Sequence, residues 1–591
     1  MNLLARVCRE VQKKSHITQR EIAQKLEVSL GRANQYIKEC IDSHYIEITN
    51  GKYFLTYKGN EFLSDFKVDN AIIIAAGFGS RFVPLTFETP KGLLEVNGER
   101  MIERQIRQLN EKGIYDITIV VGYLKEKFDY LIDKYGVKLL YNPEYSTKNN
   151  LATVYCARHL LKNTYILSSD NWISNNMFHL YECGSWYSCV YKEGKTSEWC
   201  LKVDKKKKIT NITVGGFDAL VMYGPVYFTN EFSQKLIPLL EEYYARPGTE
   251  DFYWEHILLD NLNKLPIYAN EQSVDNVYEF ENLEELREFD KSYRNYSNNE
   301  AMYHISKVLD IPESEIQNIS CLKAGMTNKS FVFSVKGKDY IFRIPGQGTD
   351  RLINRKQEAT VYRAIAHLQI SDHMVSFDEK TGYKLSCFYK GAHNLNSQNW
   401  EEIAKAMSLI KKVHCAGLTV KHCFDLRERI YFYEKLCVMN HCIEFYDYFE
   451  VKQKMEELLQ LIDTLNLPKV LCHIDCIPDN FIFLSDGSLK LLDWEYAGMC
   501  DPLVDIAMFA IYCYYDEDQI QRLIQLYLGR EATLEEELRI DSYIALSGFL
   551  WALWTEYKQS LGDEFGEYGM KMYRYAKDYY KRAKILMEKR E

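Results

Sequence analysis

The sequence predicts a multidomain chain that combines α/β and α+β folds. Its 591 residues are enough for about three domains, each able to bury its own hydrophobic core. Between residues 70 and 141, short apolar runs alternate with helical patterns, which is typical of a doubly wound parallel sheet. Residues 1–67 are mostly helical in pattern, and the stretch after residue 300 has polar motifs of its own. We therefore expect domains at residues 1–67, 68–290 and 301–591, with the polar stretch 291–300 as a linker.

The composition excludes several classes of protein. A net charge of −10 argues against a chain that coats nucleic acid over its whole length. The 16 cysteines include no Cys-x-x-Cys pair, which favours buried thiols in a reducing compartment over disulfides or zinc sites. No apolar run approaches the ~20 residues of a membrane span, and the charged first ten residues do not form a signal peptide. We expect a cytoplasmic protein with no membrane segment, and a homo-oligomer stays open.

Residues 1–67 predict three helices followed by a two-stranded wing. A capping box at Thr18-Gln-Arg-Glu21 begins the second helix, Ser29 caps the third, and Asn50-Gly51 forms a tight turn between two short strands. This order resembles the winged helix-turn-helix of bacterial regulators. The segment has 11 basic and 8 acidic residues, a net of +3, which is low for a DNA-binding face. DNA binding and a role in dimerisation or docking therefore both stay open. The third helix would present Arg32, Asn34, Gln35 and Lys38 to a groove of the DNA.

A glycine loop follows the first apolar run of the second domain. Residues 71–74 read as a buried strand, and the backbone N–H groups of the loop after it suit an anion. Arg81 and Lys91 add the positive charge that a triphosphate requires, and we expect both to be catalytic. A dinucleotide-binding loop is the alternative, but its third glycine is missing and Pro90-Lys91 follows instead. The stretch resembles nucleotidyltransferases that act on phosphorylated small molecules. Loop residues expected to contact the nucleotide are Ala75, Ala76, Gly77 and Gly79.

The alternating elements that follow predict where a metal ion binds. Strands are expected at residues 117–121, 138–141 and 165–167, with helices at 101–112 and 125–135 between them. Ligands of parallel sheets bind beyond the carboxyl ends of the strands, and Ser168-Ser169-Asp170 lies at such an end. Asp170 is therefore the first expected Mg²⁺ ligand, the alternative being an Asp that caps the next element.

Residues 71–290 resemble the bacterial CTP:phosphocholine cytidylyltransferases. The motifs that carry the resemblance are Val120-Val-Gly-Tyr-Leu-Lys125, Asn149-Asn150, Ser168-Ser-Asp170-Asn171, Glu198-Trp199 and Asp251-Phe-Tyr-Trp254. The resemblance implies a second acidic metal ligand near the domain's end. Glu281 stands where an Asp is expected, and a Glu reaches the metal with a longer side chain.

Phosphocholine carries a quaternary ammonium, which aromatic faces and carboxylates can bind. Tyr187, Trp199, Tyr253 and Trp254, with Glu198 or Asp251 nearby, are candidates for such a cage. Packing in the hydrophobic core is the alternative for each aromatic residue, because the chain has 45 tyrosines. Trp199 is the strongest candidate, since it follows Glu198 within a family motif.

The C-terminal stretch contains a phosphotransferase motif in two parts. His473-x-Asp475-x₄-Asn480 is followed by Asp493-Trp-Glu495, the order of a kinase catalytic loop and metal loop. In that arrangement Asp475 faces the acceptor hydroxyl, and Asn480 and Asp493 hold Mg²⁺ on the ATP phosphates. Upstream, Gly325 and Asn328 belong to a predicted phosphate-covering loop. Arg343 lies on the next strand, and Glu358 is expected to pair with it.

Residues 305–582 resemble choline and ethanolamine kinases and, more loosely, aminoglycoside phosphotransferases. The small-molecule family departs from protein kinases in features that this chain shares. They are Arg343 in place of Lys, Asp493-Trp-Glu in place of Asp-Phe-Gly, and Asp501-Pro502 with Asp505. That family cages choline with C-terminal aromatic residues. The resemblance therefore implies acceptor-binding roles for Glu495, Trp551, Trp554 and Tyr575, although the spacing of the two tryptophans also suits helix packing.

Together the two modules predict a bifunctional enzyme that makes CDP-choline. The kinase would form phosphocholine from choline and ATP, and the cytidylyltransferase would join it to CTP and release pyrophosphate. Three alternatives stay open: a sugar kinase fused to a sugar-1-phosphate nucleotidyltransferase, ethanolamine in place of choline, and a transcriptional regulator whose enzyme-like domains sense ligand.

Overall fold

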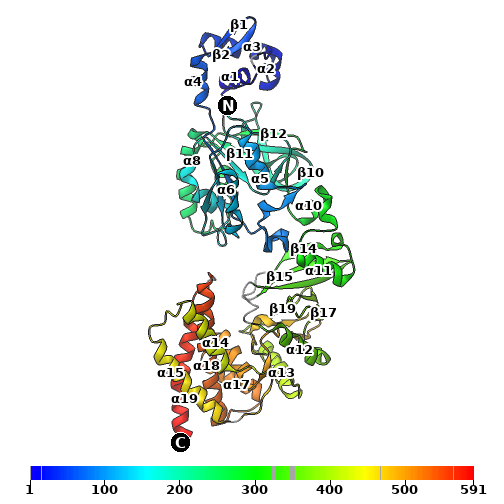
Figure 1. Ribbon diagram of the computed structural model, residues 1–591, viewed down its shortest axis with the longest axis vertical. Helices are drawn as coiled ribbons and strands as arrows, with labels where there is room; N and C mark the ends of the chain where they lie inside the picture. The colour runs from blue at the N-terminus through cyan, green and yellow to red at the C-terminus, as the bar shows by residue number, and fades with distance from the viewer. Residues whose placement is uncertain are drawn as a thin grey trace. The chain divides into compact units, whose positions relative to one another are not determined.

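The computed structural model describes residues 2–14, 16–322, 328–346, 353–465, 467–562 and 565–590. The chain divides into two compact units, Met1–Cys321 and Leu322–Glu591. Figure 1 shows the elements of each unit, which are described separately below. None of the helices within the described residues combines the length and the apolar character that crossing a membrane requires.

The first unit begins with the expected winged helix. Thr18 and Glu21 form the reciprocal capping box, and Ser29 accepts from the backbone of Arg32. Asn50 and Gly51 both have positive φ angles, +53° and +72°, as the tight turn of a two-residue hairpin requires. A fourth helix follows the wing and was not predicted. The elements are α1 (Leu3–Lys13), α2 (Gln19–Leu26), α3 (Leu30–Asp42), β1 (Ile46–Thr49), β2 (Lys52–Leu55) and α4 (Tyr57–Ser64).

A seven-stranded mixed sheet forms the rest of this unit's core. Its order is β12-β10-β11-β8-β3-β6-β7, and β8, β3, β6 and β7 are parallel as predicted. β11 runs antiparallel to β8 and pairs with the long strand β10. The strands are β3 (Asn70–Ala75), β6 (Ile117–Val121), β7 (Lys138–Tyr141), β8 (Thr164–Ser168), β10 (Trp186–Val203), β11 (Ile209–Phe228) and β12 (Tyr268–Gln272).

Helices pack against this sheet, and a small second sheet is formed by two strands outside it. β9 (Asn171–Ile173) pairs with β13 (Val277–Glu279), which brings Glu279 opposite Asn171. The sheet interior is apolar, with β3, β6 and β8 almost fully buried, as a parallel sheet covered on both faces requires. The helices are α5 (Met101–Asn110), α6 (Tyr130–Tyr135), α7 (Asn150–Cys156), α8 (Asn230–Ala245) and α9 (Glu255–Asn261).

Part of the predicted linker is secondary structure in this unit. Residues Lys291–Arg294 form a 3₁₀ helix, and the Tyr293 hydroxyl donates to the carbonyl oxygen of Glu95 at 2.7 Å. The sequence of this stretch is polar, and its one buried tyrosine did not by itself predict this contact. The remaining elements are α10 (Leu283–Phe289), α11 (Glu300–Leu309) and β14 (Gln317–Cys321).

The second unit joins an antiparallel sheet to a large helical part. Neighbouring strands of this sheet are, in order, β15 (Asn328–Val335), β16 (Lys338–Pro345), β18 (Lys384–Cys387) and β17 (Met374–Phe377). α12 (Arg355–Ile365) follows β16 in sequence. Further short strands include those that flank the catalytic motifs along the chain: β19 (His393–Asn394), β20 (Val470–Cys472), β21 (Phe481–Phe483), β22 (Leu489–Leu491) and β23 (Gly498–Cys500).

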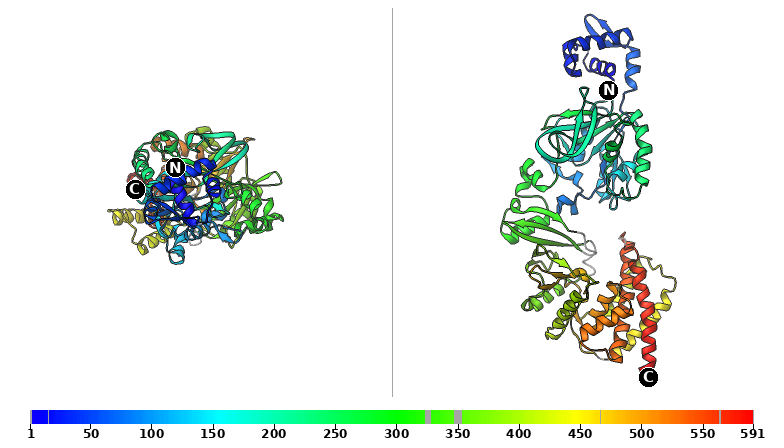
Figure 2. Two further views of the ribbon diagram at one scale, coloured as in Figure 1. Left: turned by 90° about the horizontal axis from the view of Figure 1, so that it is seen from above. Right: turned by 180° about the vertical axis from the view of Figure 1, so that it is seen from behind.

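The helical part packs around α18 (Leu534–Ser560). Most of its residues from Leu538 to Lys558 are buried, because α18 is surrounded by other helices. Figures 1 and 2 both show α18 and α19 (Tyr568–Arg590), orange to red, lying side by side. The other helices are α13 (Trp400–Cys415), α14 (Leu426–Met439), α15 (Tyr448–Thr464), α16 (Leu503–Tyr512) and α17 (Glu517–Leu528).

Candidate active sites

The first unit contains a cavity of about 660 Å³ at the carboxyl ends of its parallel strands. This is the edge at which ligands of open α/β sheets bind. The glycine loop leaves β3 there, and β8 delivers Asp170 to the same edge. The predicted residues that line the cavity are Ala75, Ala76, Gly77, Gly79, Arg81, Lys91 and Asp170.

The conformation of the glycine loop explains why residue 79 is a glycine. Gly79 has a φ angle of +68°, and a Cβ atom there would lie 3.1 Å from Thr86 Cγ2 and 3.2 Å from Lys91 Cβ. A side chain would thus strain the backbone and push against Lys91. Gly79 keeps the loop close to the Lys91 side chain that the sequence assigns to the triphosphate.

Asp170 lies in a tight polar cluster. Its Oδ2 is 2.7 Å from Lys91 Nζ, and its Oδ1 accepts from the Ser168 hydroxyl at 2.6 Å. Burial disfavours the charged carboxylate, but Lys91 and Ser168 outweigh it and lower the pKa of Asp170. Asp170 is therefore ionised at neutral pH, as a metal ligand must be.

Two glutamates from the end of the domain lie in the same cavity. Glu281, the predicted second metal ligand, forms an ion pair with Arg81. Glu279 was not predicted, yet it is the more buried of the two, and burial and the charge of Asp170 raise its pKa to about 7. The Asn171 amide donates to Glu279 Oε2 at 3.2 Å. Glu279 is the last residue of β13 and Glu281 lies beyond that strand, so the only signal in the sequence was their spacing of two residues, which does not by itself place either carboxylate at the site.

The oxygen donors of this cluster fit a hard divalent cation. Asp170, Glu279 and Glu281 supply carboxylates, the ligand type that Mg²⁺ prefers. Burial and then the charge of Asp170 raise the pKa of Glu279, and a cation between these two carboxylates would favour the ionised form of both.

Aromatic residues form another part of the same cavity. Tyr187, Glu198, Trp199 and Trp254 line it as predicted, and the Tyr187 ring stacks on Trp254 with centroids 6.0 Å apart. Asp251 does not line the cavity, since its side chain is exposed, which corrects the prediction for that residue. Glu255, four residues later at the start of α9, lies there instead and was missed.

The second unit contains a cavity of about 610 Å³. The catalytic loop, the metal loop and the strands β15 and β16 all contribute to its wall. The predicted residues that line it are Asn328, Arg343, Asp475, Asn480, Asp493, Trp551 and Trp554. Gly325 lies outside the described residues.

A buried network of charges lies beside this cavity. Arg343 forms ion pairs with Glu358, at 2.5 Å between Nη2 and Oε1, and with Asp493. Glu495, predicted to bind the acceptor, does not line the cavity: its Oε2 is 3.0 Å from Arg355 Nη1 and accepts from Asn328 at 3.1 Å. The prediction for Glu495 is thereby corrected, since the same oxygen also lies 3.7 Å from Arg343 Nη1, so that two arginines and an amide already contact this carboxylate.

The catalytic loop holds Asp475 close to other acids. The Asn480 amide donates to Asp475 Oδ2 at 3.0 Å. Burial, followed by the charges of Asp493 and Glu495, raises the pKa of Asp475 to about 8. Ile474 and Asp493 both have positive φ angles, +72° and +60°, which are rare for residues other than glycine and cluster at functional sites.

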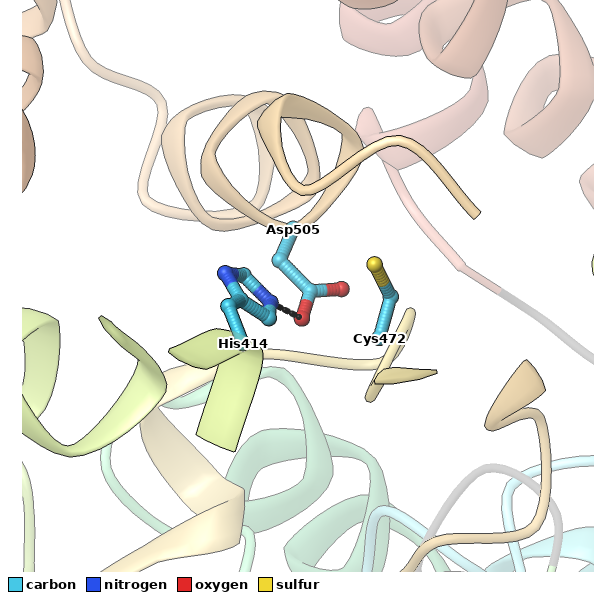
Figure 3. Close-up of side chains that lie close together, drawn as sticks. All are labelled: His414, Cys472 and Asp505. Atoms are coloured by element: carbon cyan, nitrogen blue, oxygen red, sulfur yellow. Dashed lines mark hydrogen bonds and ion pairs between the residues drawn. The ribbon is translucent and has the colours of Figure 1, made fainter. Parts of the chain in front are cut away.

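Asp505 fixes the backbone of that loop, and Figure 3 shows its hydrogen bond with His414. Its two oxygens accept from the backbone N–H groups of His473 and Ile474 at 2.9 and 2.7 Å, and from His414 Nε2 at 3.0 Å. Cys472 lies close by, but its thiol donates to carbonyl oxygens. His414, Cys472 and Asp505 are metal-ligating residue types, but their hydrogen bonds to the chain make them a support for the loop.

The aromatic wall of the second cavity differs in one residue from the prediction. Trp551 is half-buried, whereas Trp554 is only 2% exposed. Tyr575 does not line the cavity, because its hydroxyl donates to the carbonyl of Tyr515 at 2.8 Å on another side of α19. Tyr568, at the start of the same helix, together with Tyr496 completes the wall. This corrects the prediction for Tyr575: the sequence could place aromatic residues on α19 but not the side that faces the cavity.

Comparisons with known families match three parts of the chain. Residues 6–47 match the winged helix-turn-helix DNA-binding family, residues 70–182 the nucleotidyl transferase family, and residues 319–583 the choline/ethanolamine kinase family.

Individual relatives align with single parts of the chain. The choline-phosphate cytidylyltransferase of Streptococcus pneumoniae is 37% identical over 38% of this chain and 98% of its own length. The 2-aminoethylphosphonate cytidylyltransferase of Lancefieldella rimae is 35% identical over 39% of this chain and 95% of its own. The crystal structure of choline kinase LicA from Streptococcus pneumoniae has 28% identity, covers 47% of this chain and 97% of that chain, and gives a TM-score of 0.42. The chain belongs to the choline-phosphate cytidylyltransferase family, and it joins that domain to an N-terminal winged helix-turn-helix and a C-terminal choline/ethanolamine kinase domain.

Proposed function

We propose that the chain is a bifunctional enzyme that makes CDP-choline in two successive steps. The observation that carries this proposal is that each cavity combines nucleotide-site residues with an aromatic wall. In the first cavity the wall includes Trp199 and Tyr187, and in the second it includes Trp551 and Tyr568. Aromatic faces bind a quaternary ammonium, which cannot donate N–H hydrogen bonds.

In the kinase step, Asp475 acts on the acceptor hydroxyl. Its carboxylate accepts the proton while the choline oxygen forms a bond to the γ-phosphorus of ATP, and the bond from that phosphorus to the leaving ADP oxygen breaks. Asn480 orients Asp475 through the 3.0 Å hydrogen bond, and Asp505 holds the loop through two backbone N–H groups. Arg343, buried between Glu358 and Asp493, positions the metal-loop carboxylate.

In the cytidylyl step, a phosphate oxygen of phosphocholine attacks the α-phosphorus of CTP. The bond between the α-phosphorus and the bridging oxygen breaks, and pyrophosphate leaves. Arg81, Lys91 and the loop N–H groups stabilise the negative charge that builds on the leaving group. Neither step requires a covalent intermediate.

Both sites have carboxylates suited to Mg²⁺. Asp170 with Glu279 or Glu281 would hold the ion in the first site, and Asp493 with Asn480 in the second. When bound, the ion neutralises phosphate charge and fixes the orientation of the triphosphate.

The test is product analysis with purified protein, ATP and CTP, and a panel of acceptors. Choline should give phosphocholine and then CDP-choline, whereas glucosamine should give neither. Ethanolamine and 2-aminoethylphosphonate serve as competing substrates, because a relative of the first unit is named for the latter. Formation of a nucleotide sugar instead, with choline unused, would overturn the proposal.

A second function, DNA binding, is favoured by the surface of α3. Arg32, Asn34, Gln35 and Lys38 are all exposed on this helix, which follows α2 as a recognition helix does. Binding through this face should weaken steeply with salt and decrease in Arg32→Ala. A gel-shift series at low salt with no retardation of the promoter DNA upstream of the chain's own gene would leave only a docking role for the winged helix.

A further inference from the structure

The connection between β10 and β11 of the sheet domain is a dense cluster of basic residues. We call residues 202–208 the lysine turn, because its seven residues include Lys202, Lys205, Lys206, Lys207 and Lys208. Five lysines against one acid, Asp204, give this short turn a net charge of +4, more than the +3 of the whole winged helix. Lys202, Lys205 and Lys206 are exposed. So dense a positive charge on a surface attracts anions.

Hydrogen bonds fix the backbone of the lysine turn. Asp204 Oδ1 accepts from the backbone N–H groups of Lys206 at 2.7 Å and Lys208 at 2.9 Å. The backbone N–H of Ala269 on β12 donates to the carbonyl oxygen of Lys207 at 2.8 Å. Among the ion pairs of the described residues, Lys207 has a partner and the other four lysines of the turn have none. A fixed turn with uncompensated side-chain charge can bind an anion at a low cost in entropy.

The ion pair of Lys207 shows where the lysine turn lies. Lys207 Nζ is 2.6 Å from Oε2 of Glu27, a residue of the winged helix. Glu27 ends α2 in the left-handed conformation, and Ser29 caps α3 two residues later. The pair is largely exposed and contributes little to stability. Its meaning is positional: the lysine turn reaches the connection between α2 and α3.

That connection is the part of a helix-turn-helix that lies close to the DNA backbone. In such proteins the first helix of the motif crosses the backbone, and the N-terminal residues of the second helix contact base edges. Arg32, three residues after the cap of α3, is exposed in that first turn. Cations beside Glu27 would therefore lie near phosphates when α3 occupies a groove. The winged helix alone lacks a strongly basic face, and the lysine turn supplies one from the sheet domain.

We propose that the lysine turn is part of the DNA-binding surface of this chain and contacts the phosphates next to the site of α3. This inference rests on the proposed DNA binding by the winged helix, and it names the source of the phosphate contacts that the small net charge of residues 1–67 leaves unexplained. An anionic membrane is the other partner that a lysine cluster can have. Lysine clusters that bind lipid flank a membrane helix or lie on an amphipathic helix, whereas this turn joins two strands.

The experiment measures how the affinity of the full chain for duplex DNA depends on salt. The probes are the promoter DNA upstream of the chain's own gene and a random duplex of the same length. Fluorescence anisotropy titrations at several potassium chloride concentrations give the slope of log K against log salt, which counts the phosphates that the protein neutralises. Lys205→Gln combined with Lys206→Gln should reduce the magnitude of that slope by about two and weaken binding to both duplexes alike.

Two further double variants assign the effect to charge at this position. Lys205→Arg with Lys206→Arg keeps both charges and should keep the slope. The matched control is Lys411→Gln with Lys412→Gln, the same loss of charge at consecutive exposed lysines of the second unit, which should leave the slope unchanged. The thermal unfolding midpoints of both lysine-turn variants should equal that of the unmodified protein, because Lys205 and Lys206 are exposed.

The outcomes separate this inference from the proposed function. If the unmodified protein binds neither duplex at low salt, the proposed DNA binding fails and the inference fails with it. If it binds, and Lys205→Gln with Lys206→Gln keeps the full slope, DNA binding stands and the role of the lysine turn is overturned. An equal loss of slope in the control variant would also overturn it, because total charge would then matter and position would not. Binding to vesicles of equal parts phosphatidylserine and phosphatidylcholine, lost in the lysine-turn variant while DNA binding is unchanged, would assign the turn to a membrane surface instead.

Discussion

At the scale of single residues, the two tryptophans of α18 show how one helix can serve both a cavity and a core. Trp551 is half-buried and its indole N–H points to Met508 Sδ at 3.0 Å, whereas Trp554 is almost fully buried between Trp551 and Phe565. Both line the second cavity, but they contribute differently to the stability of the fold.

The first prediction separates these two contributions. Trp551→Ala should raise the KM for choline more than tenfold, because a desolvated cation–π contact contributes about 2 kcal/mol, and it should spare the KM for ATP. Trp554→Ala should in addition lower the free energy of unfolding by about 3–5 kcal/mol, the cost of a large cavity in a core. Choline and ATP titrations of the initial rate, with chemical unfolding of each variant, measure both effects. If Trp551→Ala loses ATP binding and stability together, Trp551 is a core residue and the cage lies elsewhere.

At the scale of elements, a buried ion pair ties the strands of the second unit together. Lys384, the first residue of β18, lies 2.9 Å from Asp372, just before β17, and also donates to the Tyr362 hydroxyl on α12. Burial alone would raise the pKa of Asp372, but the charge of Lys384 and hydrogen bonds from Ser386, Lys384 and Ser371 lower it to about 2.

The second prediction concerns the pH dependence of this pair. The folded-state pKa of Asp372 lies below its unfolded value of about 3.9, so the stabilisation is complete above pH ~4 and is lost as the pH falls towards 2. Asp372→Asn should lower the free energy of unfolding at pH 7 by about 3–5 kcal/mol, since Lys384 is left buried without a counter-charge. It should also make stability less dependent on pH between about 4 and 2. Urea unfolding at several pH values measures this, with Asp518→Asn as the exposed control. An unchanged stability in Asp372→Asn would show that Lys384 finds water or another partner.

The winged helix is attached to the sheet domain by another element-scale contact. Within the first unit, Arg9 of α1 lies 3.2 Å from Glu182 and also donates to the carbonyl of Tyr181. The Tyr165 hydroxyl on β8 donates to the other oxygen of Glu182 at 2.7 Å.

The third prediction follows from this contact. Arg9→Met should loosen the attachment, because Glu182 then stays buried with His179 and Tyr165 but without its arginine. Faster amide hydrogen exchange in α1 is expected, with β15–β16 of the other unit as the internal control. Unchanged exchange in α1 would show that the apolar contacts of this interface hold the winged helix without Arg9.

At the scale of the whole molecule, the chain carries two sets of catalytic residues in two separate compact units. The first has Lys91 and Asp170, and the second has Asp475 and Asp493. Each set includes its own nucleotide-site residues and its own carboxylates. Two chemically independent sites acting in series are therefore expected.

The fourth prediction tests that independence. Asp475→Asn keeps the shape but loses the carboxylate base, so phosphocholine formation should fall by ~10²-fold or more. This variant should still convert supplied phosphocholine and CTP to CDP-choline at nearly the parent rate. Asp170→Asn should do the reverse and let phosphocholine accumulate. Chromatographic product analysis from each starting substrate gives the four rates. Loss of both half-reactions in either folded variant would show that the sites are coupled.

Sequence alone determined the parts of this protein that depend on local order along the chain. The capping box at Thr18, the strands at residues 117–121 and 138–141, and the spacing from Asp475 to Asn480 are set by neighbouring residues. The three domain types also follow from sequence, because each depends on motifs in a fixed order. The residues expected at the glycine loop and at the carboxyl end of β8 do line one cavity, since strand direction fixes that edge.

Only the tertiary structure decided which side chains face the cavities. Asp251 and Tyr575 were predicted to bind substrate, but Glu255 and Tyr568, a few positions away along the chain, line the cavities instead. The direction of a side chain on a helix or loop depends on packing against distant elements, which the local sequence does not specify. Glu495 faces Arg355 instead of the cavity because β15, α12 and the metal loop meet around it. Glu279 comes next to Asp170 through the pairing of β13 with β9, which joins residues more than a hundred positions apart. Such long-range contacts leave no local pattern, because the free energy that forms them comes from burial in the folded chain.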